Sequence, residues 1–138
     1  MLLYRVRAVF DPSFAPKLRK IQIGKLRKIG AFTRRAARSK LRRKKGSSAP
    51  NSPPAIHGDK LKGRTLFAVD ESELSVATGP ALASAVRGRG VARILEEGGR
   101  TVITEGFNKG KSIYVAPRPW MGPAQQETLP AIGRILKE

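Results

Sequence analysis

The feature that most constrains this chain is a long stretch that contains no acidic side chain. Between residues 12 and 58 it carries fourteen Lys and Arg residues and no Asp or Glu. Half of the 28 basic residues therefore lie in about a third of the 138 residues. An exposed helix normally mixes charges of both signs, so a run of one sign predicts a polyanionic partner. Nucleic acid is the commonest such partner, followed by an anionic membrane surface.

The basic run also has the periodicity of an amphipathic helix. Five apolar residues fall within about 80° of one another on a helical wheel: Leu18, Ile21, Ile29, Phe32 and Ala36. Five cations cluster on the opposite side: Lys20, Arg27, Arg34, Arg38 and Arg42. We predict a basic helical region over residues 12–45 that starts at Asp11 and Pro12. Gly24 and Gly30 each weaken a helix by about 1 kcal/mol relative to Ala, which favours a break near them.

A Pro/Ser-rich loop, residues 46–56, follows the helical region. Its prolines disfavour both a helix and a central strand. The cations Arg42, Arg43, Lys44 and Lys45 lead directly into it. Together they predict a charged, flexible arm that extends the cationic surface toward nucleic acid.

The second half of the chain, residues 60–138, is nearly balanced in charge and predicts a sheet and a C-terminal helix. Turn residues separate two candidate strand pairs, at 64–69 with 74–78 and at 100–105 with 112–116. A strand is also predicted at residues 1–10, and a helix at 124–138. The fold class is α+β: a long basic N-terminal helix and a C-terminal helix packed on a small antiparallel sheet of about four strands. Residues 1–138 are expected to form a single domain.

Nothing in the sequence indicates an enzyme. There is no Cys, and His57 is the only histidine, so no multi-His or thiolate metal site and no Cys nucleophile is predicted. Gly110-Lys111-Ser112 lacks the upstream glycine of a phosphate-binding loop, and its flanks predict a hairpin turn. We therefore expect no catalytic residue, no metal and no cofactor.

The residue types that the basic run lacks narrow the choice among its possible partners. Its apolar face holds one Phe and no Trp, and Lys25 interrupts it, so it suits packing on a protein sheet better than insertion into a membrane. No ladder of exposed aromatic residues interleaves with the cations, and Asn and Gln are scarce, which disfavours base stacking and base readout. Sequence-independent contact with the phosphate backbone is the favoured interpretation, with an acidic protein or plain solvation as the alternative.

Three short motifs occur in a recognisable order in the second half. They are His57-Gly58 with Leu61, Leu95-Glu96-Glu97-Gly98, and Arg118-Pro119-Trp120-Met121. In this order, after a Pro-rich loop, they resemble the neck or tail-completion proteins of tailed bacteriophages, also called head–tail joining or virion-morphogenesis proteins. The resemblance covers about residues 34–131.

The resemblance implies a structural virion protein, either a tail-completion subunit or the tail terminator, that forms a ring between head and tail, around the DNA channel. Its expected partners are further copies of itself in a hexamer or a dodecamer, neighbouring portal, adaptor, stopper and tail-tube proteins, and genomic double-stranded DNA, with no membrane partner. The expected location is the head–tail interface of the virion, assembled in the host cytoplasm. The alternative is a sequence-independent architectural nucleic-acid-binding protein.

A second set of residues is expected at the interface with another subunit or a neighbour: Arg118, Pro119, Trp120, Met121, Glu96 and Glu97. Two prolines fix the backbone around Trp120, which favours a docking anchor. The alternative is that Trp120 packs the last helix onto the sheet.

Overall fold

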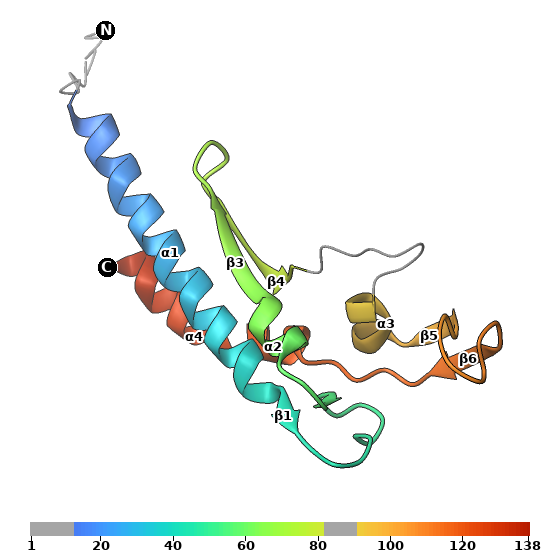
Figure 1. Cartoon of the computed structure of the whole chain (residues 1–138). Helices are drawn as coiled ribbons and strands as arrows, with labels where there is room; N and C mark the ends of the chain where they lie inside the picture. Colours follow the sequence, from blue (N-terminus) through green and yellow to red (C-terminus); the bar gives the residue numbers. More distant parts are fainter. Residues whose placement is uncertain (1–12, 82–90) are drawn as a thin grey trace, which may run out of the picture.

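A long helix, α1 (Phe14–Lys40), extends along one side of the molecule, and the other elements are arranged beside it (Figure 1). The computed structural model describes residues 13–81 and 91–138. The predicted strand at residues 1–10 and the predicted helix start at residues 11–12 lie outside the described residues.

The helix α1 is continuous over 27 residues although it contains two glycines. The predicted break near Gly24 and Gly30 is therefore wrong. Ile29 and Gly30 are buried against neighbouring elements, and packing of this kind outweighs a cost of about 1 kcal/mol per glycine. Because the helix ends at Lys40, the basic residues 42–45 follow it instead of forming its last turn.

Nine shorter elements follow α1: β1 (Arg42–Arg43), β2 (Ala55–Ile56), α2 (Lys60–Arg64), β3 (Thr65–Asp70), β4 (Ser75–Pro80), α3 (Val91–Glu97), β5 (Gly99–Val102), β6 (Ser112–Val115) and α4 (Met121–Lys137). The prediction of an α+β fold with long terminal helices is confirmed. The strands differ from the expectation in one respect. β3–β4 and β5–β6 are two separate antiparallel hairpins, and β1–β2 is a short parallel pair, so no single four-stranded sheet forms among the described residues.

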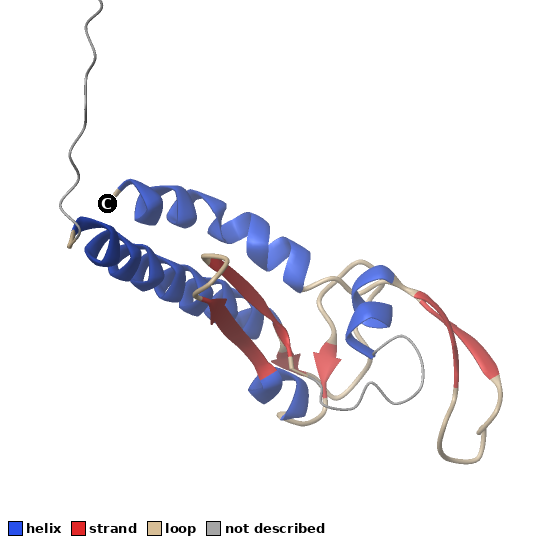
Figure 2. Ribbon diagram, turned by 90° about the horizontal axis from the view of Figure 1, so that it is seen from above, coloured by secondary structure: helices blue, strands red, loops and turns tan. Residues whose placement is uncertain are grey.

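The β3–β4 hairpin and α4 both lie alongside α1 (Figures 1 and 2). Residues of β3 alternate in exposure, so Phe67 and Val69 are half-buried while Leu66 is exposed. This alternation is typical of a strand that packs on one face only. On α1, the hairpin covers part of the side that the sequence predicted to be cationic.

Gly30 lies where α1 and the hairpin approach each other most closely. A Cβ atom at this position would lie 2.7 Å from Cγ of Phe67 and 2.9 Å from Cγ2 of Val76. Gly30→Ala is therefore expected to destabilise the protein, because overpacking of about 1–3 kcal/mol exceeds the gain in helix propensity of about 1 kcal/mol. Gly24→Ala is the matched control, since no atom lies within 4 Å of the added Cβ. It should stabilise by up to about 1 kcal/mol. Urea unfolding measures both; an equal gain for the two variants would contradict the close packing.

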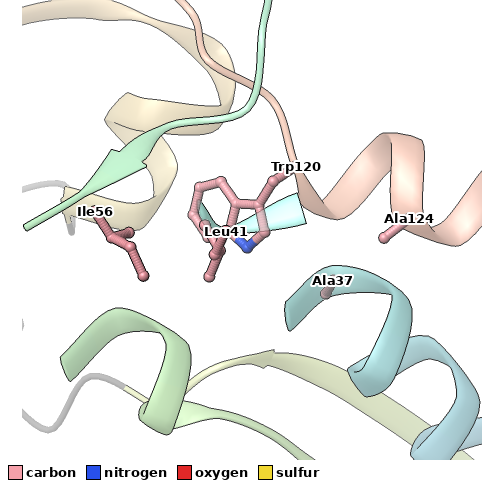
Figure 3. Packing of buried hydrophobic residues seen from close by; sticks show 5 residues of the cluster. All are labelled: Ala37, Leu41, Ile56, Trp120 and Ala124. Carbon is pink, nitrogen blue, oxygen red and sulfur yellow. The ribbon is translucent and has the colours of Figure 1, made fainter. Parts of the chain in front are cut away.

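A small core joins the end of α1 to the start of α4. It consists of Ala37, Leu41, Ile56, Trp120 and Ala124 (Figure 3). Trp120 is the largest of them and is wholly buried. Ala92 and Leu95 of α3 pack against this core from outside, so α3 is fixed to the same centre.

The β5–β6 hairpin extends away from the two long helices (Figures 1 and 2). Gly106 and Gly110, with φ of 85° and 87°, let its turn adopt a left-handed backbone. The Gly110-Lys111-Ser112 sequence lies at this turn, as the hairpin prediction requires.

Candidate nucleic-acid interface

Two arginines in the middle of α1 were predicted to face nucleic acid, and both contact the β3–β4 hairpin. Nη2 of Arg27 lies 3.0 Å from Oε1 of Glu71, and the Arg34 guanidinium lies 5.2 Å from the centroid of the Phe67 ring. The stem of a long cation can cover apolar surface in this way while its charge stays hydrated. Because the Arg27 side chain is 64% exposed, its ion pair contributes only about 0–1 kcal/mol.

Arg38 is the third predicted contact that is used inside the chain. Its Nε donates to the Thr65 carbonyl and its Nη2 to the Gly63 carbonyl, both at 3.0 Å. The guanidinium therefore fastens the end of α1 to the junction of α2 and β3. Lys20, in contrast, is exposed.

The hairpin turn beside α1 is acidic and well ordered. The Asp70 carboxylate accepts hydrogen bonds from the Ser72 hydroxyl at 2.6 Å and from the backbone N–H groups of Ser72 and Glu73. These bonds, the Ser72 hydroxyl first, hold the pKa of Asp70 below its usual 3.8. The stabilisation is present above the unfolded-state pKa and is lost as the pH falls through the lower folded-state pKa.

The four predicted contacts at 42–45 lie exposed just beyond the end of α1. Arg42 and Arg43 form β1, which pairs in parallel with β2, so that Arg43 is opposite Ile56. Nη2 of Arg43 also lies 2.5 Å from Oδ2 of Asp59. This pairing brings the chain after β2 back to the end of α1.

Three cations on α2 were not predicted to face nucleic acid, because the charge of residues 60–138 is nearly balanced over the whole segment. Lys60, Lys62 and Arg64 are all exposed. Together with the preceding group they form what we call the terminal basic cluster: Arg42, Arg43, Lys44, Lys45, Lys60, Lys62 and Arg64. Three cations within five residues are a visible signal in the sequence. That they join the first group is shown by the β1–β2 pairing and by the bond from Arg38 to the Gly63 carbonyl.

The Pro/Ser-rich loop, residues 46–56, is folded against the chain and does not form the free arm that was predicted. The Ser48 carbonyl accepts a hydrogen bond from Nε of Arg118 at 3.1 Å, and the Asn51 N–H donates to the Pro117 carbonyl at 2.8 Å. The loop is therefore held by the corner that precedes α4.

That corner is an internal joint. Trp120 is wholly buried, Met121 packs against the same core, and Pro119 is half-buried. The Arg118 guanidinium donates hydrogen bonds to two backbone carbonyls. Of the two alternatives for Trp120, this geometry corresponds to packing and not to a surface anchor.

The two adjacent glutamates on α3 have different surroundings. Glu96 accepts three backbone hydrogen bonds at the start of α4, from Trp120, Met121 and Gly122. Glu97 is exposed and pairs with Arg93 one turn earlier, at 2.9 Å. Glu96 was expected at a subunit interface, yet its carboxylate acts within the subunit.

Among the described residues, no three His, Cys, Asp or Glu side chains are placed to hold a metal ion together. Within residues 13–81 and 91–138, no helix combines the length and apolar character needed to cross a membrane. Comparisons with family models, with curated proteins and with solved structures found no match for this chain.

Proposed function

We propose that this chain is a structural protein of a tailed-phage neck, and that it forms a ring around the DNA channel between head and tail. The observation that carries the proposal is the β5–β6 hairpin, which extends from the molecule with apolar side chains outside any core. Phe107 at its turn is fully exposed, and Tyr114 is 69% exposed. Exposed apolar groups that gather on one projection are typical of contact with another protein.

The balance of buried and exposed apolar residues supports the same proposal. Among the described residues, seven hydrophobic residues are buried, while twelve large hydrophobic residues are exposed. A subunit that is completed by its neighbours accounts for this balance, because the exposed groups are then covered on assembly. The order of the motifs at His57, Leu95 and Arg118 adds the family resemblance as a second support.

The charge of the chain fits a ring that encloses DNA. Each subunit carries a net charge of +18, so a hexamer or dodecamer needs a polyanion or acidic neighbours to offset repulsion between subunits. Isolated subunits should therefore assemble better as salt screens this repulsion, over a Debye length of about 10 Å at 0.1 M.

Particles produced by a host that carries the gene provide the test. Antibody against the chain should label the junction of head and tail in electron micrographs, and deletion of the gene should leave heads and tails unjoined. Absence of the chain from purified particles, or label elsewhere on them, would overturn the proposal. In that case the terminal basic cluster still favours the alternative, an architectural protein that binds nucleic acid without sequence preference.

The hairpin gives a separate prediction about assembly. Phe107→Ser should change the unfolding free energy of the subunit by no more than about 0.5 kcal/mol, because the Phe107 side chain is fully exposed. It should weaken self-association and reduce the number of joined particles. Lys109→Ser, in the same turn, is the control and should change neither. Sedimentation and particle counts measure the effect; normal assembly of the Phe107 variant would exclude the hairpin from the interface.

A further inference from the structure

We infer that the terminal basic cluster, and not the cationic side of α1, is the surface through which this chain binds the phosphate backbone of duplex nucleic acid. The inference rests on the proposed function, in which double-stranded DNA passes the subunit. It specifies, beyond that function, which part of the subunit contacts the duplex.

Three contacts build this surface from two separate segments. The β1–β2 register places Arg43 opposite Ile56, and Arg43 also pairs with Asp59, which directly precedes α2. The bond from Arg38 to the Gly63 carbonyl fixes α2 from the other side. Residues 42–45 and α2 therefore both lie beside the C-terminal end of α1 (Figure 1).

The charge of this surface is almost uncompensated. Asp59 is the only acidic residue between residues 41 and 64, and it is paired with Arg43. Glu127 of α4 also borders the cluster, and it is paired with Lys40. On α1 the situation differs, because Arg27 meets Glu71 and Lys28 meets Glu138. On the cationic side of α1, Arg27, Arg34 and Arg38 are thus engaged inside the chain. In the terminal basic cluster, only Arg43 has an acidic partner among the described residues.

The composition of the surface favours a phosphate backbone over other polyanionic partners. Residues 41–64 contain no Phe, Tyr or Trp and no exposed large hydrophobic side chain. Without aromatic residues the surface lacks the platforms on which single-stranded bases usually stack, and without apolar groups it cannot insert into a bilayer. It also lacks the apolar centre that protein interfaces usually have.

The first segment also offers a concave site. Arg42 and Lys44, two residues apart, line a hollow of about 460 Å³ together with Ser52. Lys40 and Glu127, paired at 2.6 Å, lie on the same hollow. A surface with cations around a hollow suits several neighbouring phosphates, each neutralised by one Lys or Arg.

Two full-length variants with equal charge loss separate the cluster from the rest of the surface. The cluster variant carries Lys44→Gln, Lys45→Gln, Lys60→Gln and Lys62→Gln, which spares Arg43 and its pair with Asp59. The control variant carries Lys17→Gln, Lys20→Gln, Lys109→Gln and Lys137→Gln. Fluorescence anisotropy with a labelled duplex of arbitrary sequence, measured over a series of salt concentrations, gives the affinity and its salt dependence. Circular dichroism melting checks that both variants remain folded.

The wild-type slope of log affinity against log salt should be about −0.9 per neutralised phosphate. The cluster variant should flatten this slope by about 3–4 units, and the control by less than about 1. Equal slopes for the two folded variants would overturn the inference and leave the proposed neck function standing. If the wild-type chain binds no duplex, the DNA contact of the proposed function fails as well. Stronger competition by polyglutamate or phosphatidylserine vesicles than by unlabelled duplex would overturn the choice of partner.

Discussion

Replacement of Trp120 by Ala is expected to lower the free energy of unfolding by about 3–5 kcal/mol, the usual cost of removing a large buried aromatic side chain. The indole is wholly buried, and it contacts a core whose other members are smaller: Ala37, Leu41, Ile56 and Ala124 (Figure 3). Neighbours of this size cannot fill the cavity left behind. Urea or thermal unfolding of the full chain measures the loss.

Two variants make this prediction specific. In Trp120→Phe the hydrophobic contact is largely kept, and the loss should be smaller, because Nε1 of Trp120 has no hydrogen-bond partner among the described residues. Tyr114→Ala removes an aromatic side chain that is 69% exposed and should change stability by less than about 0.5 kcal/mol. If Trp120→Ala melted like the wild type but failed to assemble, the docking alternative would be correct and the packing account wrong.

The existence of α1 could be predicted from the sequence, but its packing only in part: Ile29 is buried and Ala36 packs against the core, as predicted. Apolar periodicity located the helix, yet Leu18, Ile21 and Phe32 of the predicted packing face are 42%, 55% and 47% exposed. The face on which a helix packs depends on which other elements of the fold lie beside it. Here the β3–β4 hairpin takes the opposite side, because Gly30 allows Phe67 to approach.

Lys25 seemed to interrupt the apolar side of α1, and the structure gives the reason for it. Its Nζ donates to the Leu136 carbonyl at 3.1 Å, and Lys28 on the next turn pairs with Glu138. The last carbonyls of a helix lack partners within the helix and attract cations. Part of the positive charge of α1 therefore stabilises the end of α4, which no local pattern in residues 12–45 could have shown.

The candidate site, like the packing of α1, could be predicted from the sequence only in part. The cations at 42–45 are exposed, as a solvent-facing site requires. The contribution of the α2 cations to this site depends on the β1–β2 pairing. Strands of only two residues leave no pattern in the sequence from which this pairing could be predicted. Glu96 was noticed only as half of an acidic pair, since its partners are more than twenty residues away.

The Glu96 carboxylate caps the N-terminus of α4. Its Oε2 accepts from the N–H groups of Trp120 and Met121 at 2.9 and 3.1 Å, and its Oε1 accepts from Gly122 at 2.7 Å. Pro123 has no N–H, and Ala124 donates to the Trp120 carbonyl within the helix. Each backbone donor of this first turn therefore has a partner or is absent, although no side chain of α4 itself caps the helix.

Glu96→Ala is therefore expected to destabilise the protein by about 2–3 kcal/mol, because three partly buried N–H groups lose a charged acceptor at the positive end of a helix. Glu96→Gln should also destabilise, since an amide NH₂ cannot accept from the N–H group it would face. Glu97→Ala is the matched control on the same helix; it removes only an exposed pair with Arg93, worth about 0.3–0.5 kcal/mol. Urea unfolding distinguishes the two positions. Equal effects at 96 and 97 would show that the carboxylate does not hold α4, whereas a loss confined to position 96 would identify α3 as the element that fixes the start of the last helix.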